Sequence, residues 1–262
     1  MGTVKILAIT NNKGGVGKTT TALNLAAALA EKGHRVLLGD LDDQGNLTYA
    51  LGAPTNSPYN VGAFLLASTR EVRQWPMHQV SPNLDLLPSH EQLGEDIGKI
   101  LKKVNHEYLL RDKLAQLPTD RYEYVVLDCP PSITDGMAYN AFCAATAYLI
   151  PTDAEPLSVL GLQRMRRLAD AVQQQQNQAL QFAGFLFTRY NPAQRGQLRQ
   201  HMVNEVRQTY GEESIIGHIR QDVALTEAQM TQQTIFAYSP RSRGAEDYKE
   251  LATSILTRLN NG

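Results

Sequence analysis

Ten consecutive residues decide how this sequence is interpreted: Asn11-Asn12-Lys13-Gly14-Gly15-Val16-Gly17-Lys18-Thr19-Thr20. They follow an apolar run and open a stretch with helical periodicity, so they join a strand to a helix. The three glycines let the backbone approach an anion closely, and its N–H groups bind that anion together with the helix N-terminus. The loop therefore predicts a nucleotide site in which Lys18 neutralises the β- and γ-phosphates and the Thr19 hydroxyl ligates Mg²⁺.

Two positions depart from the usual pattern of such loops. Asn12 stands where a glycine is common, and Lys13 adds a second cation at the start of the loop. A cation there is not needed to hold a nucleotide in its own subunit. It can instead reach a phosphate bound by a facing subunit, as an arginine finger does. The alternative is a solvated loop lysine.

Composition and patterning indicate the fold. The chain has 262 residues, 42% hydrophobic and 19% charged, with a net charge of −1. This suits one α/β domain spanning residues 1–262, and no apolar run approaches the ~18 residues of a membrane span. Apolar runs alternate with helical patterns, which predicts a doubly wound, mostly parallel sheet with helices on both faces, as in P-loop NTPases. The strands expected are Val4–Thr10, Arg35–Asp40, Leu84–Pro88, Glu123–Asp128, Ala145–Pro151, Gln181–Thr188 and Ser214–Ile219. The helices expected lie near Lys18–Lys32, His106–Gln116, Ile133–Ala144, Pro156–Gln178, Gly196–Tyr210 and Ala245–Leu259.

Three blocks carry a resemblance to a known family. Lys13–Thr19, Asp40–Asn46 and Asp128–Ser132 closely resemble the deviant Walker ATPases of the ParA/MinD family. The resemblance covers nearly the whole chain. Leu225–Ala228 and the ending Tyr238–Ala245 resemble the ParA (Soj-like) branch, whose members position DNA or other large cargo.

The resemblance implies a site and its cofactors, ATP and Mg²⁺. The phosphate-loop residues expected to contact the nucleotide are Lys13, Gly14, Gly15, Val16, Gly17, Lys18, Thr19 and Thr20. Catalytic roles fall to Lys13, to Asp42 as the hydrolytic residue, and to Asp40 in support. The metal is expected at Thr19, Asp40 and Asp128. Adenine contacts are expected around the end of the strand 181–188 and after Ile219.

Physical chemistry is consistent with these carboxylate roles. Two acids two residues apart at an extended strand end point the same way, so Asp40 and Asp42 can both face Mg²⁺ and the attacking water. Asp128 ends an apolar strand, where a residue that holds Mg²⁺ through water is expected. Asp43 replaces the family's proline and Gly39 its bulky apolar residue. Asp43 either adds negative charge beside the triphosphate, which raises the metal requirement or slows turnover, or simply faces solvent.

The mechanism implied is a switch. ATP joins two monomers face to face in a sandwich homodimer, and slow, Mg-dependent hydrolysis dissolves it once a ParB-like or other adaptor completes the site. The ATP dimer binds DNA non-specifically. The basic residues expected for this are Arg189, Arg195, Arg199 and Arg220, since no acid lies between residues 189 and 201.

Other functions remain open. A related ATPase positions protein cargo, such as carboxysomes or chemoreceptor arrays, and the sequence does not separate that role from plasmid or chromosome partition. A MinD-like membrane-cycling ATPase needs a basic C-terminal helix, and this one is short of cations. Stable membrane insertion is not expected, and the location expected is cytoplasmic and nucleoid-associated. Metabolic synthetases share the loop but usually lack the lysine at the position of Lys13.

Overall fold

A computed structural model describes residues 4–132, 136–155, 158–193 and 197–260. In this part of the chain one sheet has the strand order β3-β4-β2-β5-β1-β6-β7-β8. Neighbouring strands are parallel except β3, which pairs antiparallel with β4 at one edge. The strands are β1 (Lys5–Ile9), β2 (Val36–Asp40), β3 (His78–Ser81), β4 (Leu84–Leu87), β5 (Tyr124–Asp128), β6 (Ala147–Thr152), β7 (Gln181–Thr188) and β8 (Ile215–Ile219).

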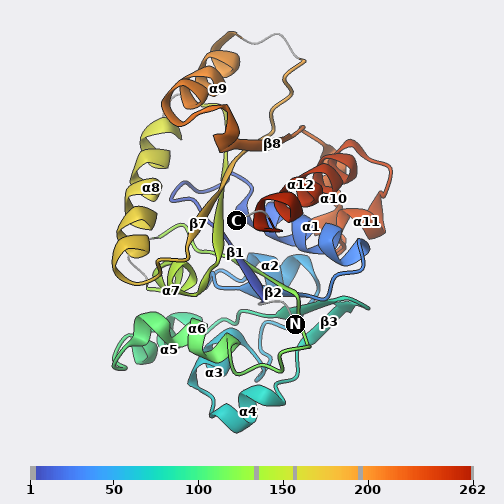
Figure 1. Cartoon of the computed structure of the whole chain (residues 1–262). Coiled ribbons are helices and arrows are strands. Elements are labelled where there is room, and N and C mark those ends of the chain that lie inside the picture. The colour runs from blue at the N-terminus through green and yellow to red at the C-terminus, as the bar shows by residue number, and fades with distance from the viewer. Residues whose placement is uncertain (1–3, 133–135, 156–157, 194–196, 261–262) are drawn as a thin grey trace.

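Helices cover both faces of this sheet (Figure 1). The α-helices of the described residues are α1 (Lys18–Glu31), α2 (Asn46–Ala50), α3 (Val61–Leu66), α4 (Thr69–Arg73), α5 (Leu93–Ile100), α6 (Leu109–Leu114), α7 (Met137–Ala144), α8 (Ser158–Gln175), α9 (Gln197–Tyr210), α10 (Val223–Met230), α11 (Ile235–Tyr238) and α12 (Arg243–Asn260). Short 3-10 turns cover His106–Tyr108 and Glu212–Ser214. None of the helices in the described ranges is both long and apolar enough to pass through a membrane.

Alternation along the central strand β1 builds two cores. Leu7 and Ile9 point into a core shared with α1 and α12, whereas Ala8 points into the opposite core with α7 and α8. Successive side chains of a strand face opposite ways, so a strand covered on both sides is apolar throughout. The doubly wound, mostly parallel fold is thereby confirmed.

The structure differs from the sequence prediction mainly between residues 45 and 115. Strand β3 was not predicted, because His78-Gln79-Val80-Ser81 is a half-buried edge segment with no apolar run. Helices α2 to α5 were not predicted either, and each has only five to eight residues, too short for a clear helical period. The helix expected over His106–Gln116 is a 3-10 turn followed by α6. Later in the chain, α10 and α11 are likewise short helices that patterning missed.

Candidate nucleotide-binding site

The phosphate loop runs from the end of β1 to the start of α1, at the carboxyl edge of the sheet. Gly15 and Gly17 have φ values of +72° and +82°, in the left-handed region that favours glycine. A Cβ on Gly17 would also lie 3.4 Å from Cγ2 of Thr188 at the end of β7. The Thr188 hydroxyl donates to the Val16 carbonyl at 3.0 Å. The end of strand β7 therefore supports the phosphate loop at both Val16 and Gly17.

Lys18 supplies the buried positive charge of the loop. Its Nζ donates to the Lys13 carbonyl at 3.1 Å, so the lysine bridges the loop from within. Burial lowers the pKa of Lys18, and the nearby Asp128 and Asp42 carboxylates act in the opposite direction. A buried ammonium group needs negative charge close by, and phosphate oxygens would supply it.

Asp40 and Asp128 end neighbouring strands in register but have different surroundings. Within the described residues, both carboxylate oxygens of Asp128 are buried and accept no hydrogen bond of good geometry. Burial raises the pKa of Asp128 well above its usual range, and the nearby Thr19 hydroxyl acts against this. Both oxygens of Asp40 accept hydrogen bonds, Oδ1 from Asp42 N and Oδ2 from Thr48 N and Oγ1. Burial also raises the pKa of Asp40, to about 6. The unsatisfied oxygens of Asp128 fit a site completed by a metal or its waters, whereas the geometry does not favour the metal-ligand role expected of Asp40.

Asp42 borders a cavity of about 600 Å³ with the phosphate loop. Lys18, Thr19 and Gln44 line the same cavity, so the structure brings Asp42 and the metal-ligand candidate Thr19 together. Burial raises the pKa of Asp42, and the Gln44 backbone N–H, which donates to its Oδ1 at 3.1 Å, acts against this. A carboxylate so placed can accept a hydrogen bond from an attacking water.

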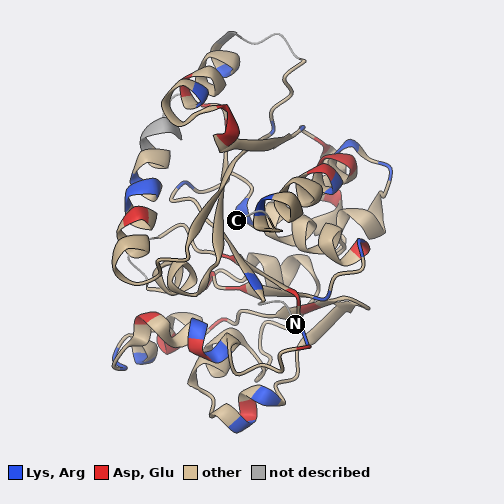
Figure 2. Ribbon diagram, viewed as in Figure 1, with Lys and Arg blue, Asp and Glu red and all other residues tan. Residues whose placement is uncertain are grey.

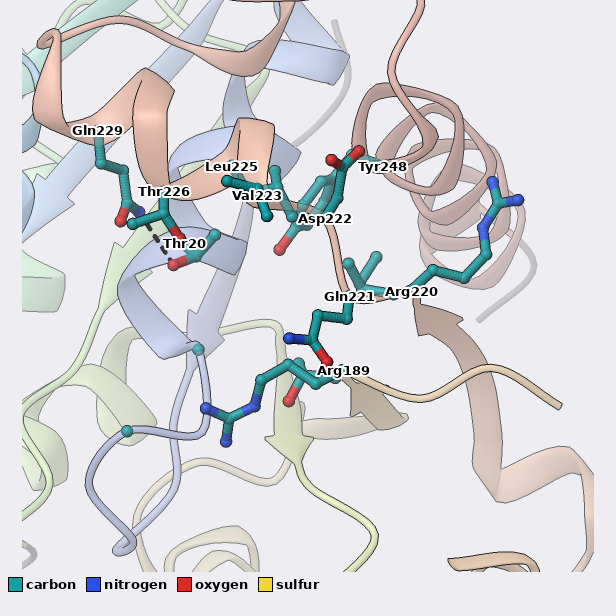
Figure 3. A pocket seen from close by; sticks show the side chains of 14 residues that line it. Thr20, Arg189, Arg220, Gln221, Asp222, Val223, Leu225, Thr226, Gln229 and Tyr248 are labelled. Carbon is teal, nitrogen blue, oxygen red and sulfur yellow. Dashed lines mark hydrogen bonds between the residues drawn. The ribbon is translucent and has the colours of Figure 1, made fainter. Parts of the chain in front are cut away.

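A second cavity, of about 340 Å³, continues from the phosphate loop toward α12 (Figure 3). Its floor includes Thr20, whose hydroxyl accepts a hydrogen bond from Gln229 Nε2 at 2.9 Å. Its walls come from the ends of β7 and β8 and the start of α10, with apolar contributions from Val223 and Tyr248. These are the segments where the resemblance implies adenine contacts. Thr20 was expected to contact the nucleotide, but sequence reasoning named no adenine-contacting residue, because the pocket forms only where segments distant in sequence meet.

Lys13 lies at the outer side of the loop and is ion-paired within its own chain. Its Nζ is 2.9 Å from Asp153 Oδ2 and 2.7 Å from Glu155 Oε2, both just after β6. Partial burial lowers the pKa of Lys13, but the hydrogen bonds to Glu155 and Asp153 outweigh this and raise it overall. The side chain is 35% exposed, so it can leave these partners without disturbing the core. The acids were not singled out from the sequence, since no pattern links residues 13 and 153.

The four arginines expected to bind DNA have different surroundings. Arg189 follows β7, is 53% exposed, and lies 3.5 Å from Asp153. Arg199 is exposed on α9, and its Nη1 donates to the Arg189 carbonyl at 3.4 Å, so the two are neighbours. Arg195 lies outside the described residues. Arg220 is ion-paired with Asp247 at 2.7 Å and Glu246 at 3.1 Å, and in Figure 3 it points away from the cavity.

Charge is mixed on the surface around these arginines. Figure 2 shows acidic and basic residues interspersed along α8, α9 and α12. Arg220 is offset by acids of α12, whereas Arg189 and Arg199 are both exposed and Arg189 lies near a single acid, Asp153. No group of three or more His, Cys, Asp or Glu side chains that could hold a metal occurs among the residues that the structure describes.

Comparison with known proteins gives concordant results. Residues 4–182 match the model of the AAA domain family. The sporulation initiation inhibitor protein Soj of Bacillus subtilis is 35% identical over 251 residues, which cover 96% of this chain and 98% of that protein. The chromosome partitioning protein ParA of Caulobacter vibrioides is 32% identical over 256 residues, covering 97% and 95%.

Solved structures extend the likeness to three dimensions. A cobyrinic acid a,c-diamide synthase from Mycobacterium smegmatis, with an ATP analogue and magnesium, matches with a TM-score of 0.83 and 30% identity over 99% of this chain and 97% of that one. McdA of Cyanothece matches with a TM-score of 0.84 over 97% and 99%, and at 20% identity this likeness concerns the fold. The phosphate loop, the fold and the near full-length relatives agree, and the chain belongs to the ParA family of P-loop ATPases.

Proposed function

We propose that this chain binds ATP with Mg²⁺, forms an ATP-dependent sandwich homodimer and hydrolyses ATP slowly until an adaptor protein stimulates it. The ATP dimer holds DNA non-specifically and positions or segregates cargo in the cytoplasm, on the nucleoid. The observation that carries the proposal is the phosphate loop with two lysines, one buried toward the nucleotide and one free to leave its surface partners. The ATP analogue and magnesium named for the cobyrinic acid a,c-diamide synthase structure support the choice of ligand.

Each part of the site has a role in this proposal. The loop backbone from Gly14 to Thr20 and the Lys18 ammonium hold the phosphates. The Thr19 hydroxyl and, through water, Asp128 hold Mg²⁺, which neutralises phosphate charge when bound. The Asp128 oxygens, buried without partners, support this assignment.

Hydrolysis requires a water in line with the γ-phosphate. Asp42 accepts a hydrogen bond from that water, which attacks phosphorus as the bond to the β,γ-bridging oxygen breaks. Positive charge beside that bridging oxygen stabilises the leaving diphosphate. Lys13 supplies this charge to the facing subunit once it exchanges Asp153 and Glu155 for phosphate oxygens.

Two other candidates share the fold. Positioning of protein cargo instead of DNA is compatible with the same switch. An amide-forming synthase is suggested by the name of one structural relative. Amide transfer from glutamine commonly uses an activated cysteine thiolate, but the chain's two cysteines, Cys129 and Cys143, are free and buried, and burial raises the pKa of both. The ATPase switch is therefore favoured.

DNA retention tests the proposal. Retention of purified protein is measured without nucleotide, with ADP and with ATP, at two salt concentrations. We expect retention only with ATP, and a steep loss with salt. ATP-dependent dimerisation without DNA retention would refute the DNA role and direct the next test to liposomes and protein cargo.

The role of Lys13 has its own test by light scattering. Lys13→Ala is expected to bind ATP normally and to remain monomeric, because the charge given to the facing subunit is missing. Lys32→Ala, an exposed lysine just after α1, is the matched control and should dimerise as the wild type does. A Lys13→Ala protein that dimerises normally would exclude the trans role.

A further inference from the structure

Behind Asp42 lies a buried chain of polar side chains that the catalytic roles do not explain. Asp40, Thr48 and Ser89, in three different segments, are each 0% exposed. Asp40 Oδ2 accepts from the Thr48 hydroxyl at 2.6 Å and from Thr48 N at 2.9 Å. The same hydroxyl accepts from Ser89 N at 2.8 Å. Ser89 Oγ then donates to the Asp42 carbonyl at 2.7 Å.

These contacts close a ring around the loop that carries Asp42. The loop leaves β2 at Asp40 and re-enters regular structure in α2, where Thr48 bonds back to Asp40. Asp42 N donates to Asp40 Oδ1 at 3.3 Å, and the Asp42 carbonyl accepts from Ser89 Oγ and from Gly45 N. The backbone of Asp42 is therefore fixed on both sides, while its carboxylate borders the cavity.

Most of the hydrogen-bonding capacity of the ring is used internally. A hydroxyl has one proton, and the Thr48 proton goes to Asp40 while a lone pair accepts from Ser89 N. Asp40 uses one oxygen for Asp42 N and the other for both Thr48 donors. The neighbouring Asp128 has the same strand-end position, but neither of its oxygens has a hydrogen-bond partner comparable to those of Asp40 within the described residues.

We propose that Asp40, Thr48 and Ser89 are positioning residues, which hold the loop from residue 41 to residue 47 so that the Asp42 carboxylate meets the attacking water. Asp40 then acts through Asp42 and touches neither the metal nor the nucleotide. The inference rests on the proposed hydrolysis of ATP. It assigns to Thr48 and Ser89, neither of which the sequence marked, a share in the rate of that reaction.

The Thr48 hydroxyl connects the two groups that hold the Asp42 loop, because it bonds to both Asp40 and Ser89 N. Thr48→Val keeps the shape of the side chain but removes the donor to Asp40 and the acceptor for Ser89 N. Both anchors of the loop are then weakened together. A displacement of about 1 Å at a reacting group can lower a rate by about 100-fold. We therefore expect kcat for ATP hydrolysis to fall tenfold or more, with little change in the affinity for Mg-ATP.

The experiment compares three variants of the whole chain with the wild type. Thr48→Val removes the hydroxyl, and Thr48→Ser restores it. Thr146→Val is the matched control, because the Thr146 hydroxyl also accepts from and donates to backbone, at Ile6 N (2.9 Å) and Ile6 O (3.0 Å), near the opposite edge of the sheet. Steady-state kcat and KM, binding of a fluorescent ATP analogue, and hydrogen exchange of amides 41–48 without nucleotide are measured below the melting temperature of every variant.

The expected pattern is specific. Thr48→Val lowers kcat and accelerates exchange in the loop, Thr48→Ser recovers both, and Thr146→Val lowers the melting temperature with kcat unchanged. A folded Thr48→Val protein with wild-type kcat, or slow exchange in its loop, would overturn the inference, as would Thr48→Ser as slow as Thr48→Val. The wild type distinguishes failure of the proposed function from failure of this inference. If the wild type does not hydrolyse ATP, the proposed function fails, and hydrogen exchange of the loop still tests whether the ring holds it.

Discussion

The phosphate end of the molecule and its arginine-bearing end are built on different principles. Around the phosphate loop, charged groups are buried and their positions follow from backbone bonds, as with Lys18 on the Lys13 carbonyl. Arg189, just after β7, and Arg199, on α9, have exposed side chains, and Arg189 shares Asp153 with Lys13. Geometry therefore determines the chemistry of the first region. In the second, function depends on net charge and on a partner, so its mutations should have smaller effects.

The largest effect is expected at Lys18. Lys18→Ala removes the only buried ammonium group that lines the described part of the phosphate cavity. Truncating one member of a desolvated charge pair commonly costs about 2–5 kcal/mol, a loss of about 30-fold or more in affinity. Titration with a fluorescent ATP analogue measures it, and Lys32→Ala should bind as the wild type does. ATP binding of wild-type affinity in Lys18→Ala would show that buried charge matters no more at the phosphate loop than exposed charge does at the arginine-bearing end.

A large effect on turnover is expected at Asp42. Loss of a positioned general base lowers rates by about 100- to 10,000-fold, so Asp42→Ala should retain ATP and accumulate as a dimer. Phosphate release and light scattering measure the two properties. Asp43→Ala is the neighbouring control: unchanged turnover would mean that Asp43 faces solvent, and faster turnover that its charge slows the reaction. Rapid phosphate release from Asp42→Ala would contradict its role.

The sequence predicted this first region better than the rest of the molecule. A strand, a glycine loop and a helix are local features, so residues 11–20 could be located without the fold. The carboxyl ends of parallel strands share an edge, which is why Asp42 and Asp128 could be assigned to the same site. The difference between Asp40 and Asp128 could not be predicted, because it depends on Thr48 and Ser89.

Ion pairs between residues distant in sequence also explain why the surroundings of Lys13 and Arg220 could not be predicted. Lys13 and Asp153 are 140 residues apart, and Arg220 meets Asp247 only because α12 packs beside β8. An arginine counted as basic in the sequence is therefore not equivalent to a free charge. Charge runs overestimate a basic surface wherever the fold supplies acids.

A moderate effect is expected from Arg189→Ala combined with Arg199→Ala. The two exposed arginines lie together, and a dimer presents them twice. Each phosphate contact removed lowers the slope of log affinity against log salt by about 1, so the variant should bind DNA more weakly and with less salt dependence. Arg35→Ala, an exposed arginine just before β2, is the control. Unchanged retention would move the DNA surface away from β7 and α9.

The smallest effect is a difference in stability between the two register neighbours. Burial and the neighbouring Asp40 carboxylate disfavour the ionised form of Asp128 and raise its pKa. Asp128→Asn removes that ionisable group, so the ligand-free protein should gain about 1–3 kcal/mol and several degrees in Tm while losing Mg-dependent nucleotide binding. Asp40→Asn should lower Tm at pH 7, because its amide group sets a donor against Asp42 N or the Thr48 donors. Differential scanning fluorimetry without nucleotide measures both. Shifts of the same sign would mean that the two acids share one environment, and opposite signs mean that one serves the fold and the other the ligand.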